Sequence, residues 1–144
     1  MPLTWQPYLA DYWVMYDLPI TFKLSAEAIQ GVQENWTSTA EADPEQPVLM
    51  AIPEAFKGPG GALSPEELYG MAILNCFIAT FKVIAEASKF SFEKVNASMK
   101  LDVDKNEAGK LWVARTHIDL EMHKPADAAK LPRLLEKASD NCLV

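Results

Sequence analysis

Two cysteines, Cys76 and Cys142, are the residues of this sequence best suited to carry out chemistry. In a reducing compartment a cysteine pair is more often redox-active or incidental than structural, and the thiolate is the reactive form of the side chain. Residue type alone favours a plainer interpretation of Cys76, because a free cysteine inside an apolar helix usually packs as a small hydrophobic residue. The elements that position the two cysteines decide between these interpretations.

Cys76 lies in a stretch, residues 64–89, that predicts one long helix. Ser64 is a predicted N-cap, Pro65 takes the first helical position, and Glu67 completes a capping box. Apolar residues cover every face of the next four turns, so this helix must be buried on nearly all sides. It is about 38 Å long at ~1.5 Å per residue, which is too long for one small sheet to wrap. We therefore expect a second subunit to cover it.

Cys142 follows a second predicted helix, residues 126–141, in which Pro132 marks a kink or a restart. The apolar residues of this helix are spaced three or four positions apart, so they form one stripe that faces the core. They are Leu131, Leu134, Leu135 and Ala138, and Cys142 continues the series. Both cysteines are thus directed inward, and the pattern allows them to meet.

Three strands are predicted before the central helix. Aromatic and β-branched residues indicate strands at 12–24, 32–40 and 48–52, with a turn through residues 25–31 between the first two. A glycine-containing loop then leads to Ser64. These elements predict an antiparallel meander that precedes the helix.

A long hairpin is predicted after the central helix. Residues 92–103 and 111–122 alternate between apolar and polar side chains, and a loop at 105–110 joins them. We expect the apolar face of the second strand to consist of Trp112, Ala114, Ile118, Leu120 and Met122. The solvent face is expected to consist of Arg115, His117, Asp119, Glu121 and His123. The two histidines would be about 20 Å apart along the strand, so we predict no metal site there.

Length and composition limit the function further. The 144 residues suit one domain, 1–144, with residues 1–10 as an N-terminal arm. A net charge of -7 argues against nucleic acid or an anionic membrane surface as a partner. Lys82 and Glu86 interrupt the apolar run of the central helix, so it is not expected to span a membrane. Two cysteines and the lack of a hydrophobic signal region predict a reducing, cytoplasmic setting. No cofactor is predicted.

This order of elements resembles the OsmC/Ohr family of hydroperoxide reductases, from about Tyr12 to the C-terminus. The resemblance rests on four pieces of sequence: Ser64-Pro65-Glu66-Glu67-Leu68, a cysteine ten residues after Glu66, the Leu74-to-Phe77 step LNCF, and Asp140-Asn141-Cys142. It implies an α+β, OsmC-like fold, in which antiparallel sheets pack around a long buried central helix in an intertwined homodimer. The implied homodimer agrees with the second subunit that the helix pattern requires.

The resemblance also implies a chemistry and a set of site residues. Cys76 would be the thiolate that attacks an organic hydroperoxide and becomes a sulfenic acid. Cys142 would then condense with it to a disulfide, which a dithiol reductant reopens. Glu66 matches the family's carboxylate, which holds an arginine against the reactive thiolate. The apolar pocket for the substrate is expected around Leu74, Phe77, Ile78 and Phe81.

The sequence departs from the family pattern in its arginines. The family's arginine comes from the segment before the central helix, whereas this chain has no arginine before Arg115. Lys23 and Lys57 are candidate replacements, although lysine cannot form a bidentate fork with a carboxylate. The sequence therefore leaves two functions open. One is a peroxidase, and the other is a catalytically weak or inactive dimeric scaffold that binds a small hydrophobic ligand.

The spacing of Glu66 and Cys76 raises a separate question. Ten residues of regular helix separate them by about 15 Å along the axis and by about 280° of turn. Contact between the two side chains therefore needs a kinked start of the helix, an intervening cation, or the partner subunit.

Overall fold

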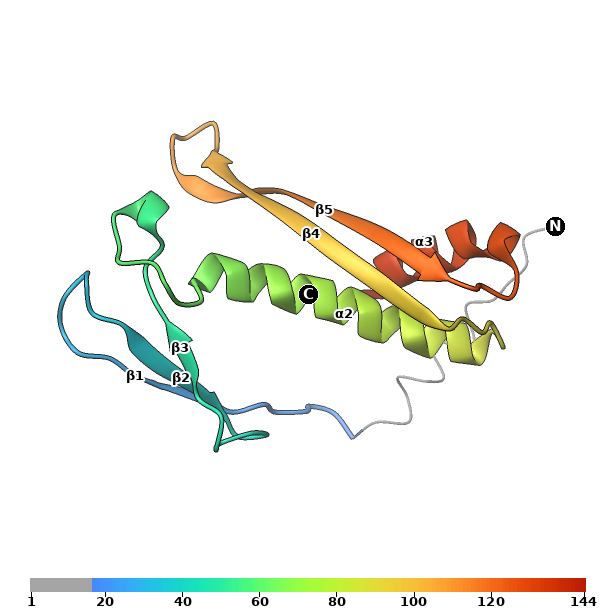
Figure 1. The fold of residues 1–144 in the computed structure, drawn as a ribbon, viewed down its shortest axis with the longest axis horizontal. Coiled ribbons are helices and arrows are strands. Elements are labelled where there is room, and N and C mark those ends of the chain that lie inside the picture. The colour runs from blue at the N-terminus through green and yellow to red at the C-terminus, as the bar shows by residue number, and fades with distance from the viewer. Residues whose placement is uncertain (1–16) are drawn as a thin grey trace.

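The computed structural model describes residues 17–144, which form a three-stranded sheet, a long helix, a two-stranded hairpin and a C-terminal helix (Figure 1). In Figure 1 the first sheet lies on one side of the long helix and the hairpin lies on the other. The N-terminal arm expected at residues 1–10, and the first part of the strand expected at 12–24, lie outside the described residues.

The first sheet is an antiparallel meander of β1 (Leu24–Glu27), β2 (Trp36–Ala40) and β3 (Val48–Met50). The second and third predicted strands are confirmed in shorter form. The first prediction is wrong for residues 17–23, which form no strand, while β1 extends into the segment predicted to be a turn. The reason is cross-strand pairing, since Leu24 pairs with Ala40 and Glu27 pairs with Thr37. Partner strands override local propensity in sheets.

The long helix α2 (Pro65–Ala87) begins as the sequence predicts. The Ser64 hydroxyl accepts a hydrogen bond from the Glu67 backbone N–H at 3.1 Å, and the Ser64 backbone N–H donates to the Glu67 carboxylate at 2.8 Å. These hydrogen bonds from Ser64 hold the pKa of the Glu67 carboxyl below its usual value. The helix then runs for 23 residues without a break at Gly70, which is buried.

The hairpin of β4 (Lys94–Lys105) and β5 (Leu111–His123) is confirmed. The alternation predicted for β4 is also confirmed, with Val95 to Val103 half-buried at every second position. One part of the β5 prediction is wrong, because Trp112 is 52% exposed. A β-bulge shifts the register at Asp102 and Val103, so that Val113 pairs with Val103. The extra residue in β5 moves the side chains on its far side to the opposite face of the hairpin, so Trp112 faces solvent.

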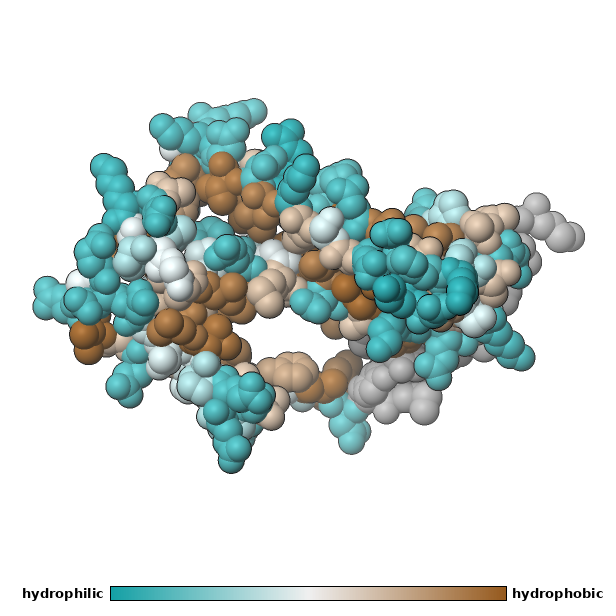
Figure 2. All heavy atoms as spheres, in the orientation of Figure 1, coloured by the Kyte–Doolittle hydropathy of each residue, from teal (hydrophilic) through white to brown (hydrophobic). Residues whose placement is uncertain are grey.

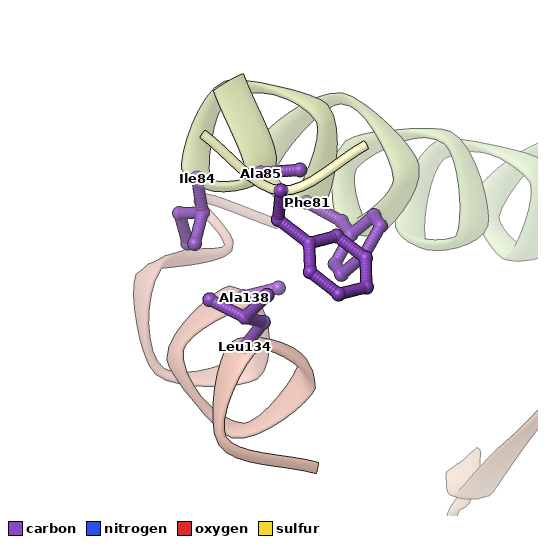
Figure 3. Close-up of a cluster of buried hydrophobic side chains, with 6 residues drawn as sticks. Phe81, Ile84, Ala85, Leu134 and Ala138 are labelled. Carbon is purple, nitrogen blue, oxygen red and sulfur yellow. The ribbon is translucent and has the colours of Figure 1, made fainter. Parts of the chain in front are cut away.

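The C-terminal helix α3 (Leu131–Asn141) follows a short 3₁₀ turn, η2 (Ala128–Lys130). Pro132 lies in the first turn of α3 and therefore marks a restart of the helix rather than a kink. The side chains between α2 and α3 form a buried hydrophobic core (Figure 3). The buried members of this core are Phe81, Ile84, Ala85, Phe90, Leu134 and Ala138.

Within one chain α2 is buried at only four positions, Gly70, Phe81, Ile84 and Ala85. Leu68, Tyr69 and Met71 are 40 to 47% exposed. Figure 2 shows hydrophobic residues on the visible face where α2 runs between the hairpin and the first sheet. By length and composition α2 passes a test for a membrane-spanning helix that core helices of soluble proteins also pass. Here it packs on β4 and α3, and a single chain leaves much of its apolar surface uncovered.

The core between α2 and α3 yields a prediction about stability. Phe81 is 2% exposed and contacts both Phe92 and the α3 cluster. Replacing it by alanine should lower the free energy of unfolding by about 3–5 kcal/mol, because the lost burial leaves a cavity. Urea denaturation followed by circular dichroism measures this change. The control is Glu136→Ala at an exposed position of α3, and equal midpoints for the two variants would contradict the assignment.

Candidate active site

The two cysteines come together where α3 ends against the middle of α2. Both are half-buried free thiols, and no disulfide joins them. The Cys142 thiol donates a hydrogen bond to the carbonyl oxygen of Val144 at 3.8 Å, and it lies close enough to Cys76 for each thiol to shift the pKa of the other. The backbone N–H of Leu143 donates to the Cys76 sulfur at 3.3 Å, across 67 residues of sequence. The inward stripes of the two predicted helices therefore meet at this pair.

The position of Cys142 follows from the packing of α3. Leu134 and Ala138 pack against Phe81 and Ile84 of α2 (Figure 3). Since Leu143, just beyond α3, reaches Cys76, which precedes Phe81 on α2, the C-terminal end of α3 lies towards the middle of α2. Cys142 is the C-cap of α3 and has an extended backbone, with φ -66° and ψ 129°. The chain thus leaves the helix at Cys142 and carries the next backbone N–H to the Cys76 sulfur.

The two thiols differ in their electrostatic surroundings. Burial raises the pKa of Cys76, but hydrogen bonds from the Cys142 thiol, the main chain of Val144 and Leu143, and the Thr80 side chain outweigh it and lower the pKa below that of an ordinary thiol. Burial and the hydrogen bond to Cys76 raise the pKa of Cys142. These surroundings favour the thiolate at Cys76 and the protonated thiol at Cys142.

Sequence reasoning missed two parts of this site. Thr80 lies four residues after Cys76, so the helix repeat brings its hydroxyl alongside the sulfur; that spacing was a signal available in the sequence. The backbone N–H of Leu143 carries no such signal, because its position depends on how α3 ends.

A cavity of about 630 Å³ lies at the N-terminal end of α2, between this helix and β4. Apolar side chains line most of it, and Glu66 lies in its wall. One carboxylate oxygen of Glu66, Oε2, is buried and has no hydrogen-bond partner among the described residues. The remaining wall consists of Pro53, Ala55, Phe56, Leu63, Ser64, Glu67, Gly70, Met71, Leu74, Met99, Leu101 and Val103.

The residues predicted to form the substrate pocket are dispersed. Leu74 lines the cavity. Phe81 belongs to the core between α2 and α3, and Phe77 packs against that core. Ile78 is half-buried. Only Leu74 of the four therefore lies in the wall of this cavity, and a role for the others in substrate binding stays a prediction.

Glu66 and Cys76 are not brought together within one chain. Because α2 is continuous from Pro65, they remain about 15 Å apart along the axis and about 80° apart around it by the shorter path. A kinked helix start is thereby excluded. The proposed lysine substitutes are also elsewhere: Lys23 pairs with Glu41 at 3.9 Å, and neither Lys23 nor Lys57 lines the cavity or contributes to the pKa shift of Cys76.

The polar face of β5 is exposed except at His123, which is half-buried, and its side chains pair with one another or with β4. Arg115 bonds Asp102 at 2.9 Å, and His117 contacts Asp119 at 3.1 Å. His123 contacts Asn96 at 3.0 Å. Across residues 17–144 no three His, Cys, Asp or Glu side chains gather in a way that could hold a metal ion.

Solved structures share this fold. An organic hydroperoxide resistance protein from Elizabethkingia anophelis matches with a TM-score of 0.70 and 16% identity, covering 88% of this chain and 86% of that chain. An organic hydroperoxide resistance protein OsmC from Legionella pneumophila matches with a TM-score of 0.70 and 20% identity, covering 88% of both chains. OhrB of Bacillus subtilis matches with 0.66 and 18%, covering 86% and 87%.

The sequence itself carries a family signature, although no curated protein matches it. The model of the family described as OsmC-like protein matches residues 58–144, which include the whole of α2, the hairpin, α3 and both cysteines. This match covers more than half of the chain and agrees with the α+β architecture. The chain therefore belongs to the OsmC-like protein family.

Proposed function

We propose that this protein is a thiol-dependent peroxidase that reduces organic hydroperoxides through Cys76 and Cys142. The observation that carries the proposal is that two free thiols come together where the segment after α3 meets α2, with the Leu143 N–H bonded to the Cys76 sulfur at 3.3 Å. Their pKa shifts, down for Cys76 and up for Cys142, support the same assignment. Environments that separate two neighbouring titratable groups in this way assign one as nucleophile and the other as proton holder. The names of the structural relatives are consistent with this chemistry.

The proposed reaction has two balanced steps. The Cys76 thiolate attacks the distal oxygen of a hydroperoxide, so the O–O bond breaks, Cys76 becomes a sulfenic acid, and the alkoxide leaves and takes a proton to become an alcohol. The Cys142 thiol then attacks the sulfenic sulfur, which forms a disulfide and releases water. A dithiol reductant restores both thiols. This last requirement fits a reducing, cytoplasmic setting.

A homodimer is part of the proposal. Leu68, Tyr69 and Met71 form an exposed apolar surface on α2. In addition, the buried Glu66 oxygen needs a donor that the described residues of one chain do not supply. A second copy would cover the helix and supply such a donor. Because α2 is continuous, the partner subunit is also a remaining way to connect Glu66 with the cysteine site.

A second function is supported by a specific observation. The cavity at Glu66 is mostly apolar, and Cys76 is not part of its wall. A cavity of this volume suits a small hydrophobic ligand. The protein would then be a dimeric scaffold in which the cysteines serve packing alone.

Turnover of peroxide separates these two functions. With cumene hydroperoxide and dithiothreitol we expect the wild type to consume peroxide and Cys76→Ser to be inactive, because the substitution removes the nucleophile. Peroxide remaining over time is the measurement. Turnover that survives in Cys76→Ser, or no turnover in the wild type, would favour the scaffold.

The proposed reaction forms a disulfide between Cys76 and Cys142 that can be detected directly. One equivalent of cumene hydroperoxide without reductant should yield a peptide linking Cys76 and Cys142 in a non-reducing digest. In Cys142→Ser this peptide should be absent, and a trappable sulfenic acid should remain at Cys76. Unmodified thiols at both positions after peroxide treatment would contradict the two-cysteine cycle.

The pKa shifts predict which thiol reacts first. As the pH rises, Cys76 should ionise before an ordinary thiol does and Cys142 after it. Limiting iodoacetamide at pH 7 should therefore label Cys76 first, as read by peptide mass spectrometry. Cys142→Ala should raise the pKa of Cys76 by removing a donor, while Cys142→Ser keeps a donor and serves as the matched control. Preferential labelling of Cys142 would refute the assignment.

The dimer is tested by light scattering at micromolar concentration, where the wild type should have twice the mass of one 16.0 kDa chain. Leu68→Glu places a charge on the exposed apolar surface of α2 and should shift the population towards monomer. Lys100→Glu, on the solvent face of β4, is the control and should remain dimeric. A monomeric wild type would remove the dimer from the proposal.

A further inference from the structure

We infer that the backbone N–H of Leu143 is a catalytic hydrogen-bond donor that stabilises the Cys76 thiolate. This inference rests on the proposed function, because it assigns a further group to the same thiol chemistry. Its geometric basis is the 3.3 Å hydrogen bond from the Leu143 nitrogen to the Cys76 sulfur. The donor touches the reacting atom itself, so it acts on the nucleophile directly.

The groups around Cys76 show why such a donor matters. Burial disfavours the thiolate, and the groups that oppose burial are all hydrogen-bond donors: the Cys142 thiol, the main chain of Val144 and Leu143, and the Thr80 hydroxyl. None of them carries a positive charge. Hydrogen bonds to an ionised group are stronger than those between neutral groups, so preorganised donors can replace a cation at this position.

The N–H of Leu143 is available because of how α3 ends. Cys142 is the C-cap, and its extended backbone takes Leu143 out of the helical hydrogen-bond ladder. A backbone N–H that has lost its helical acceptor needs another partner, and the Cys76 sulfur is that partner. The same short segment thus delivers two groups, the Cys142 thiol and the next N–H.

This arrangement differs from a side-chain site in one respect. A backbone donor cannot be removed by truncating the side chain, so Leu143→Ala should keep it. Proline at 143 lacks the N–H and removes it. Proline also requires an extended conformation of the preceding residue, and Cys142 already has φ -66° and ψ 129°. Leu143→Pro is therefore a substitution that the observed backbone of Cys142 accommodates.

The test measures the pH dependence of Cys76 alkylation by iodoacetamide, with peptide mass spectrometry to separate Cys76 from Cys142. In Leu143→Pro the midpoint should move to higher pH, and the rate at pH 7 should fall about tenfold or more, as expected for loss of a hydrogen bond to a charged group. Leu143→Ala should alkylate like the wild type. A wild-type profile in a folded Leu143→Pro variant would overturn the inference.

A measurement on the unaltered backbone decides the matter if Leu143→Pro does not fold. In ¹⁵N-leucine-labelled protein the amide proton of Leu143 should shift downfield as Cys76 ionises, with the midpoint found by alkylation. The shift should vanish in Cys76→Ala. An amide that does not respond to Cys76 ionisation would overturn the inference. Neither experiment uses a peroxide, so failure of the peroxidase proposal and failure of this inference are separate results.

Discussion

The packing of α3 against the C-terminal half of α2 is the interaction on which the site depends. Phe81 and Ala138 are almost completely buried in this contact. The contact fixes the direction of α3 and its position along the axis of α2. Cys142 lies one residue beyond α3, so its distance from Cys76 is set by apolar side chains one or two turns away. The cysteine pair is therefore held by a hydrophobic contact and carries no covalent or ionic restraint of its own among the described groups.

The electrostatics of the pair follow from that placement. A thiol in a partly apolar setting ordinarily becomes harder to ionise, and burial acts in this direction on both cysteines. The hydrogen bond between them then acts oppositely on its two ends, because it stabilises the ionised form of the acceptor and the protonated form of the donor. Main-chain donors after α3 and the Thr80 hydroxyl lower the pKa of Cys76 further, so Cys76 becomes the more acidic of the two thiols. The surroundings of the pair thus make Cys76 the more acidic and Cys142 the less acidic of two chemically identical side chains.

The sequence predicted the parts of the fold that local patterns encode. The capping box at Ser64 and the period-two alternation of β4 both appear as expected, since each depends on neighbours in sequence. The outward position of Trp112 depends on a bulge in the pairing of β4 with β5, which no single-strand pattern records. Phe81 illustrates the limit for the site: its apolar character predicted burial, but whether it faced a pocket or α3 depended on tertiary packing.

One chain alone keeps Glu66 apart from Cys76. Glu66 and Cys76 lie on the same rigid helix, so no movement of loops or strands can bring them together while α2 remains continuous. Yet Glu66 keeps a buried carboxylate oxygen without a partner among residues 17–144, at the wall of an apolar cavity. Leaving such an oxygen desolvated is costly, and the cost persists until a donor reaches it. In the proposed dimer that donor comes from the second chain, and the uncovered apolar surface of α2 supplies the reason for the second chain to bind there.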